Sequence, residues 1–482
     1  MRHRLSLRRP WTAACRPQRS YSGAVQVPAR SRPGATSLRE RAAELTRSDT
    51  GRAAGLGAAM IVANVLALGF TVVFARVLGA SGYGDLAVLL SSFIIMMVPG
   101  SALQIAAARE VSHDIAEGNP NAGAGVRRWL ERLVLATVAV AVIAIPVRSL
   151  IAALINIDQD WAAAAIPVTA MLWIILSVLR GVLQGFQQYR TVALSIVGEA
   201  SSRIAFALIL VGVGLDVTGA FLGSAFSLIA VAVVLLVPLR RQLEGVNPEA
   251  AATLRLRELL AGAWVPVLGL TLLLALQELH VIIVKHQAAN DDAAGSYAVA
   301  AVAGKAIMWI AIGLGLYLLP EASRRAKIGE DARPILLRTL GLIGAMAVPA
   351  VLIYSVAGEP LLRIVFGEDL TQASDALPFL GLAMSLLACS YLSVQYLLAM
   401  GKASFLFVLA GGVVAEVPIL LSLGEDLTAI AIALLGIQAV CAAVILTMAM
   451  RQRTPTGHVF AGLTADEDEV VPEPTLRHVG TR

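Results

Sequence analysis

The chain has 482 residues, of which 57% are hydrophobic and only 15% charged, and its formal net charge is +5 at pH 7. A water-soluble chain of this length needs far more polar surface, so the composition excludes an ordinary globular protein and indicates the bilayer as its solvent. The basic residues occupy one tail and alternate loops, which is the mark of a membrane topology and not of nucleic-acid binding. The three cysteines are isolated, so we expect no disulfide, no thiolate metal site and no cofactor.

Both ends of the chain differ from its apolar middle. Residues 1–51 form an Arg-rich arm that we expect to be disordered and cytoplasmic, where it would meet anionic membrane lipids. An unimportant tail and a start codon placed too early remain alternatives, and a mitochondrial transit peptide is disfavoured. Residues 451–482 carry an acidic patch, and we expect them to form a second disordered cytoplasmic tail.

Twelve apolar runs lie between these tails, and each is close to the ~20 residues that cross a hydrocarbon core. They predict an all-α polytopic membrane protein with twelve transmembrane helices. The runs are 55–77, 86–107, 133–154, 161–182, 192–214, 218–239, 260–283, 297–319, 335–357, 377–399, 403–423 and 427–449.

Charge in the connecting loops predicts the orientation. One set of alternate loops holds most of the Lys and Arg residues, including Arg127, Arg128, Arg240, Arg241, Arg324 and Arg325. The other set is rich in Asp and Glu, including Asp85, Asp291 and Asp292. Cytoplasmic loops carry the positive excess, so we predict a cell (inner) membrane protein with both termini in the cytoplasm.

The second half of the chain resembles the first at an offset of about 214 residues. Segment 81–89 resembles 295–302, 106–112 resembles 321–327, and 181–194 resembles 395–408. Six helices in each half predict two six-helix lobes related by a parallel pseudo-two-fold repeat, with a cavity between them. The predicted domains are 52–239 for the first lobe, 240–259 for a cytoplasmic linker and 260–450 for the second lobe.

Ionisable residues inside the spans are candidate sites, because placing a charged side chain in the hydrocarbon core costs several kcal/mol unless it has a partner or is hydrated. Glu199 and Arg203 are four residues apart in the fifth span and can meet on one helix face. We interpret Glu199 and Arg203 either as a cavity-facing charge pair that holds or releases an anionic substrate group, or as a structural ion pair between packed helices. Lys305 in the eighth span has no acidic neighbour at i±3 or i±4, so it requires another helix, water or a ligand.

Glu416 lies in the middle of the eleventh span, and subtracting the offset places it beside Arg203 in the repeat. It is either a proton-coupled carboxylate or a Glu paired across the lobe interface. Glu278 and His280 lie near the outer end of the seventh span. There His280 either gains and loses a proton in a proton-coupled cycle or is simply hydrated. Arg76, at the outer end of the first span, suits a phosphate contact or a headgroup, and Arg180 lies at the cytoplasmic edge of its span.

An ordered set of segments resembles the polysaccharide flippase family. The segments are FARVLGASGYG (74–84), RGVLQGFQQY (180–189), VIIVKHQAANDDAAGSYAVAA (281–301) and PEASRRA (320–326). The resemblance covers about residues 52–450, and the family belongs to the superfamily that also holds the multidrug and toxic-compound extruders (MATE) and the lipid II flippase.

The resemblance implies a MATE-like, two-lobed transporter that moves lipid-linked oligosaccharides to the outer leaflet. Arg76, Arg180, Arg203 and Lys305 become candidates for contacts with the pyrophosphate-sugar head, and Glu199, Glu278, His280 and Glu416 for ion coupling. Relatives often carry an Asp in the seventh span where this chain has His280, which puts the ion coupling in doubt. A polysaccharide polymerase or glycosyltransferases are possible partners.

Three other functions remain open from the sequence. A drug or cation antiporter of the same fold is the first alternative, although few aromatics and the buried cations Arg203 and Lys305 favour an anionic substrate. A membrane enzyme of polysaccharide assembly is disfavoured, because no loop carries a metal-ligand cluster or a phosphate cradle. A scaffold that no longer transports is the third.

Overall fold

The computed structural model describes residues 49–452 except 120, 124 and 245–255, and every regular element in this part is a helix. The expectations for the two tails, and most of the predicted linker 240–259, fall outside the described residues. The first half contains α2 (Asp49–Met96), α3 (Val98–Ala116), α4 (Val126–Ala144), α5 (Arg148–Ile155), α6 (Asp160–Gly185), α7 (Tyr189–Leu210), the π-helix η1 (Val211–Leu215) and α8 (Asp216–Gln242).

The second half begins at α9 after the undescribed residues 245–255. It contains α9 (Leu256–Gln287), α10 (Asp291–Gly304), α11 (Ala306–Lys327), α12 (Arg333–Val365), the 3-10 turns η3 (Glu368–Leu370) and η4 (Ser374–Ala376), α13 (Leu377–Ala399), α14 (Phe405–Leu421) and α15 (Leu427–Arg451). Each of the twelve predicted apolar runs therefore coincides with helix.

By length and composition, eight helical segments in the described part are able to cross a membrane, or nine if the bent pair α4–α5 is one span. The chain is thus an all-helical, multi-span protein. Two of the eight, Gly55–Ala116 and Tyr189–Gln242, hold 62 and 54 residues, where one crossing needs about 20. Each is interrupted, the first at Gly79 (φ 71°) and the second at Gly214 (φ 91°) within η1, a backbone conformation that glycine adopts readily.

Two predicted spans are interrupted in the structure. Between α4 and α5 the axis turns by 78°, and Pro146 lies at this bend, where it supplies no backbone N–H to continue the helix. The eighth predicted span consists of α10 and α11, and Lys305 is the residue that ends one and begins the other. A lysine thus lies at a break in the helix.

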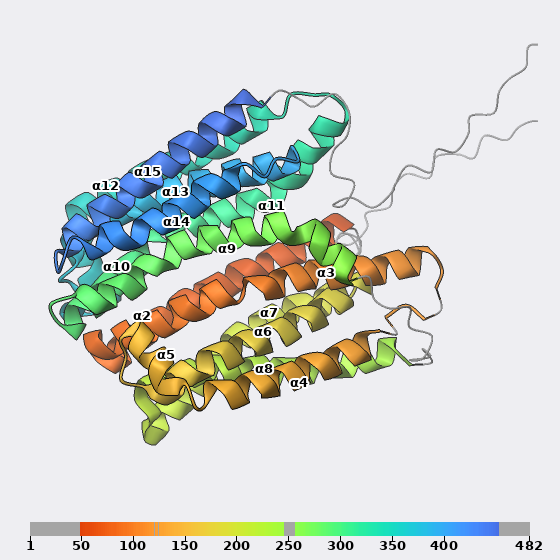
Figure 1. Ribbon diagram of the computed structural model, residues 1–482, viewed down its shortest axis with the longest axis horizontal. Coiled ribbons are helices and arrows are strands. Elements are labelled where there is room, and N and C mark those ends of the chain that lie inside the picture. Colours follow the sequence, from red (N-terminus) through yellow and green to blue (C-terminus); the bar gives the residue numbers. More distant parts are fainter. Residues whose placement is uncertain (1–48, 120, 124, 245–255, 453–482) are drawn as a thin grey trace, which may run out of the picture.

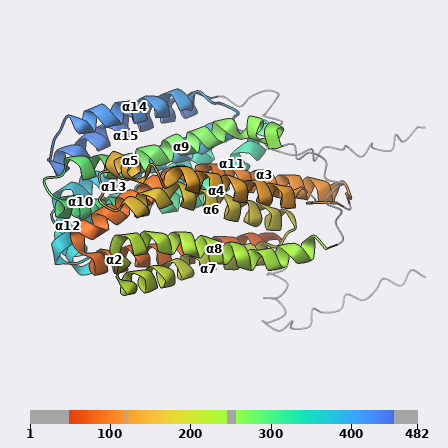
Figure 2. The ribbon, with the colours of Figure 1, turned by 60° about the horizontal axis from the view of Figure 1, so that its bottom comes forward.

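The helices of the two halves form two groups with the same internal packing order. Figure 1 shows α2–α8 gathered on one side and α9–α15 on the other, and in Figure 2 α14 and α15 lie on the opposite side of the molecule from α7 and α8. In the first group α3 and α8 pack on α6, and α2 packs on α7; in the second, α11 and α15 pack on α13, and α9 packs on α14. Tyr83 and Tyr297, which the sequence repeat aligns, are both buried.

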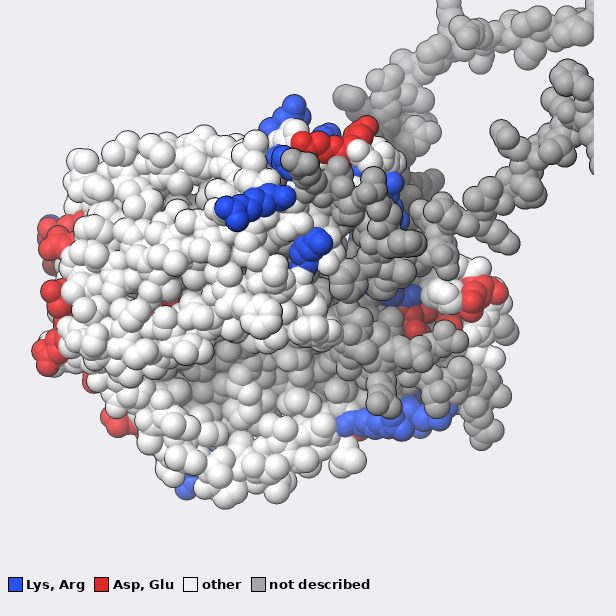
Figure 3. Space-filling view, turned by 45° about the horizontal axis from the view of Figure 1, so that its top comes forward, with Lys and Arg blue, Asp and Glu red and all other residues white. Residues whose placement is uncertain are grey.

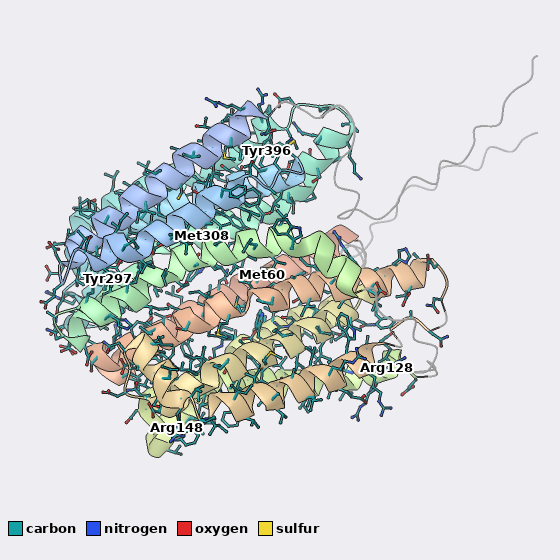
Figure 4. All side chains as sticks on the ribbon, viewed as in Figure 1. Met60, Arg128, Arg148, Tyr297, Met308 and Tyr396 are labelled. Atoms are coloured by element: carbon teal, nitrogen blue, oxygen red, sulfur yellow. The ribbon has the colours of Figure 1, made fainter. Side chains whose placement is uncertain are left out.

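Opposite charges gather at opposite ends of the molecule. Figure 3 shows Asp and Glu at its left end and most Lys and Arg in its right half. The acidic end contains Asp85, Asp158, Asp160, Asp291 and Asp292, and the basic end contains Arg127, Arg128, Arg240, Arg241, Arg324 and Arg325. Figure 4 labels Arg148 and Arg128 at these two ends of the α4–α5 region.

The two groups touch most closely where α2 crosses α10. A Cβ atom added to Gly295 would overlap the backbone carbonyl of Ala80, and one added to Gly84 would lie 3.1 Å from the amide nitrogen of Gly295. Small residues allow membrane helices to approach in this way. The crossing therefore requires glycine at position 295.

We expect Gly295→Ala to lower the thermal stability of the detergent-purified protein, because a backbone carbonyl cannot move aside as a flexible side chain does. Overpacking of this kind costs about 1–3 kcal/mol, which a fluorescence-detected melting curve resolves. Gly313→Ala on α11 is the matched control, since nothing lies within 4 Å of a Cβ added there. Equal melting temperatures for the two variants would show that the crossing is looser than described.

Candidate functional site

Two arginines share one carboxylate in the first half. Glu199 on α7 pairs with Arg203 one turn later, and with Arg180 from α6 at 3.4 Å. Arg180 also donates from Nε and Nη2 to the side chain and backbone oxygens of Ser195, each at 3.0 Å, and lies 5.7 Å from the ring centroid of Trp173. Two guanidinium groups against one carboxylate leave one net positive charge.

The two arginines differ in their exposure. The side chain of Arg180 is 4% exposed and that of Arg203 is 22% exposed, and Nε of Arg203 has no hydrogen-bond partner. Arg180 lies five residues before the end of α6, so its position near the edge of the span is unchanged. The charge rule alone does not account for it, because the residue is buried in an ion network. Arg203 is the more exposed of the two arginines, so it is the one better placed to contact an anion.

A second ion pair lies in the second half. Nζ of Lys305, at the α10–α11 break, lies 2.7 Å from Oε2 of Glu278 on α9, and both side chains are buried. Gln277 donates to the other carboxylate oxygen at 2.9 Å, and Ser91 on α2 donates to Oε2 at 2.7 Å. Lys305 has no acidic residue at i±3 or i±4, and it thus pairs with a carboxylate from another helix.

A third polar group surrounds Glu416 in the core of the second half. Glu416, on α14, is fully buried and neither carboxylate oxygen has a hydrogen-bond partner, although the backbone N–H of His280 lies near. Gln438 on α15 is also fully buried, with an unpartnered side-chain oxygen. No described cation pairs with Glu416, so a pair across the interface is not what the structure contains.

His280 is not a wet residue near the surface. It is fully buried, with Nδ1 3.0 Å from the hydroxyl of Tyr297 and Nε2 3.0 Å from the carbonyl oxygen of Gln277. The expectation of hydration is therefore wrong, because α10 packs over the part of α9 that carries this ring. His280 and Glu416 belong to one buried polar cluster.

Arg76 lies apart from the other candidate residues. Its guanidinium donates to the backbone carbonyls of Ile364 and Val365 at the end of α12. The last carbonyls of a helix lack intrahelical partners and attract cations. Arg76 therefore joins the first half to the second at the acidic end.

Three further contacts between the halves lie near it. Lys285 on α9 pairs with Asp85 on α2 at 2.6 Å, Asn156 donates to the carbonyl oxygen of Lys285 at 2.8 Å, and Ser91 reaches Glu278. These contacts hold the two groups together at the acidic end.

The candidate residues thus form one cluster in the first half, two adjoining groups in the second half that Gln277 links, and the Arg76 contact. They do not form a single site. Ser91, Asp85 and Tyr297 were not predicted as partners of the candidate residues. Only Tyr297 carried a signal in the sequence, since the repeat aligns it with Tyr83. Among the described residues no group of three or more His, Cys, Asp or Glu side chains is arranged to hold a metal ion.

Comparison with known proteins gives a family and a fold. The sequence profile described as polysaccharide biosynthesis protein matches residues 53–320, more than half of the chain. No curated protein matches the sequence.

Solved structures of similar fold are multidrug transporters. An inward-facing MATE family transporter of the MOP superfamily is 12% identical with a TM-score of 0.68, over 81% of this chain and 94% of that one. An outward-facing MATE transporter is 13% identical with a TM-score of 0.58, over 85% of this chain and 97% of that one. The MATE multidrug transporter DinF-BH is 16% identical with a TM-score of 0.56, over 83% of this chain and 96% of that one. Identities this low show the fold alone.

We expect Lys305→Met to destabilise the protein by about 3–5 kcal/mol, because it leaves the buried carboxylate of Glu278 without its cation. The double variant with Glu278→Gln removes both charges and should recover most of this loss. Melting of the wild type, both single variants and the double variant gives the coupling energy. Additive losses would mean that the two charges do not interact.

Proposed function

This chain belongs to the polysaccharide biosynthesis protein family, and from that premise we propose that it flips a lipid-linked oligosaccharide from the inner to the outer leaflet. The carrier in this proposal is a polyprenyl pyrophosphate, and the movement is alternating access between two lobes. Transport, and not catalysis, is the activity that the MATE-like fold supports.

The proposed topology has twelve crossings in two lobes, 52–239 and 260–450, related by a parallel two-fold repeat. The breaks at Gly79 and Gly214 divide the two longest helical segments into four pieces, each long enough for one crossing. The matching packing order of the two groups supports the repeat. The basic end then faces the cytoplasm by the positive-inside rule.

The observation that carries the proposal is the set of contacts between the two halves at the acidic end. Three of the charged residues in these contacts keep a partner in their own half: Lys285 has Asp291 at 2.6 Å, Asp85 has Gln159 at 2.9 Å, and Glu278 has Lys305. Arg76 would lose its carbonyl partners, but it is exposed. Separation of the halves here would therefore leave each of the other three charges with a partner. A closed acidic end and the higher TM-score against the inward-facing transporter both support an inward-facing state.

We assign the anionic head to the first half. Arg203 is partly exposed, and the Arg180–Glu199–Arg203 cluster carries one net positive charge. A pyrophosphate accepts several charge-assisted hydrogen bonds from guanidinium groups. Arg203 is the leading contact, Arg180 positions Glu199 behind it, and Lys305 is reached only after Glu278 releases it.

Ion coupling is assigned to Glu416. An ionised carboxylate with no partner is very costly in an apolar interior, so this group carries a proton or a cation there. The backbone of His280 lies next to it, and Gln438 donates to the carbonyl oxygen of Leu276, one turn before His280 on α9. A drug or cation antiporter is the second candidate function, and this acidic cluster together with the similar multidrug transporters favours it.

Arg203→Ala should abolish export of the surface polysaccharide without unfolding the protein, because Glu199 keeps Arg180 as its cation. Lys305→Ala should abolish it as well, at a cost in stability. The measurement is leaflet-resolved quantification of lipid-linked oligosaccharide, in cells that lack the wild-type gene. Accumulation in the inner leaflet is the expected result.

Arg363→Ala is the matched control, since this arginine is exposed and, among the described residues, pairs only with Glu359 on its own helix. Normal export by Arg203→Ala would remove the residue from the site. Normal export after deletion of the whole gene would support a scaffold, and efflux of organic cations instead of oligosaccharide would support the antiporter.

Glu416→Gln should stop gradient-driven transport in proteoliposomes and leave substrate binding intact, because the amide matches the shape of the carboxyl group but takes up no proton. Glu359→Gln, at an exposed position on α12, should transport as the wild type does. The flux is measured with and without an imposed pH or sodium gradient. Undiminished stimulation of Glu416→Gln by either gradient would contradict the assignment.

A further inference from the structure

A lateral groove in the first half belongs to none of the clusters described above. It encloses about 1090 Å³, at the upper end of the range for small-molecule sites. α4 and α8 form its walls, and α6, on which both pack, forms its floor. It lies in the half of these helices nearest the basic end.

The walls and floor of the groove are apolar. Val134 and Val138 on α4 and Val233 on α8 are each more than half exposed, and Leu172 and Ile175 on α6 lie beneath them. The lining of α4 extends from Arg127 to Val138, which is about 16 Å at the rise of an α-helix. This is close to half of the ~30 Å hydrocarbon core, and therefore to one leaflet.

The mouth of the groove carries both signs of charge. Arg127 and Glu131 come from α4, and Arg240 and Glu244 from the end of α8 and the residues after it. Arg127 pairs with Glu131 at 2.9 Å, whereas no described residue forms an ion pair with Arg240. Two cations and two carboxylates suit a headgroup that itself has a phosphate and an ammonium group.

We infer that this groove binds a zwitterionic phospholipid with a primary ammonium, of the phosphatidylethanolamine type, in the leaflet at the basic end. Its phosphate contacts Arg240 and Arg127, its ammonium contacts Glu244 and Glu131, and its acyl chains lie along α6. A purely anionic head would gain the arginines but would face two carboxylates. The inference does not depend on the proposed transport activity.

The groove is separate from the proposed head-group cluster. Leu172, Ile175 and Leu179 of α6 line the groove, whereas Arg180 of the same helix is turned toward Ser195 and Glu199 on α7. A substrate tail in this groove would therefore lie on the other side of α6 from that cluster. This separation favours a resident phospholipid over the transported molecule.

The test is the lipid that copurifies with the protein from nanodiscs of equal phosphatidylethanolamine and phosphatidylglycerol, measured by native mass spectrometry. The wild type should retain phosphatidylethanolamine in preference, and Arg240→Ala should lose at least several-fold of it. Arg241→Ala is the matched control, because it changes the neighbouring arginine, which does not line the groove. It should retain lipid as the wild type does.

Ala232→Trp provides a second variant that leaves the mouth intact, since Ala232 lines the apolar part and a large side chain there fills it. It should also lose the lipid while melting as the wild type does. Equal retention by Arg240→Ala and Arg241→Ala, a preference for phosphatidylglycerol, or lipid undisplaced by Ala232→Trp would each overturn the inference.

Discussion

The structure depends on one constraint: a charge that cannot reach water inside a membrane must have a partner wherever it is buried. Glu199 has two arginines, Lys305 has Glu278, and Lys285 has Asp85 and Asp291. Isolated ions in this setting cost several kcal/mol each, so these pairs decide which helices stay together. Pairs within one half stabilise a lobe, and pairs between the halves stabilise one relative position of the two.

The contacts between the halves are built so that they can be broken. Lys285 pairs with one carboxylate from each half, and Glu278 keeps Lys305 and Gln277 when Ser91 leaves. The cost of separation is therefore a change of partner and not the exposure of a bare ion. The close crossing of α2 and α10 at Gly295 adds packing to the same end, so the acidic end is held by contacts of short range that opening would release together.

Much of the fold was predictable because its signals are local. Runs of apolar residues with alternate loop charges gave the helices, and the ordered segments from 74–84 to 320–326 gave the family that the profile match confirms. Glu199 and Arg203 were paired correctly since i,i+4 spacing fixes their geometry. The bend between α4 and α5 lies inside the predicted span 133–154, at Pro146, but its angle of 78° follows from packing that the sequence does not specify.

The partners of the buried charges were predictable only where the helix itself supplied them. Arg180 joins Glu199 because α6 and α7 are neighbours, and Glu278 meets Lys305 across 27 residues of sequence. His280 was judged by its distance along the span, which says nothing about the helix that covers it. Helix neighbours and rotations are properties of tertiary packing, and a single sequence does not specify them.

The two halves share a packing order yet differ in their unbalanced charge. The first half has one positive charge in excess at Arg203, while the second balances Lys305 with Glu278 and leaves Glu416 alone. In the proposed cycle an anionic head and a coupling cation therefore occupy different lobes. Neither ligand touches the other, so their coupling must pass through the contacts between the halves. We assign this coupling to the hydrogen bond from Ser91 to Glu278, because it joins α2 in the first half to α9, the helix that also carries His280.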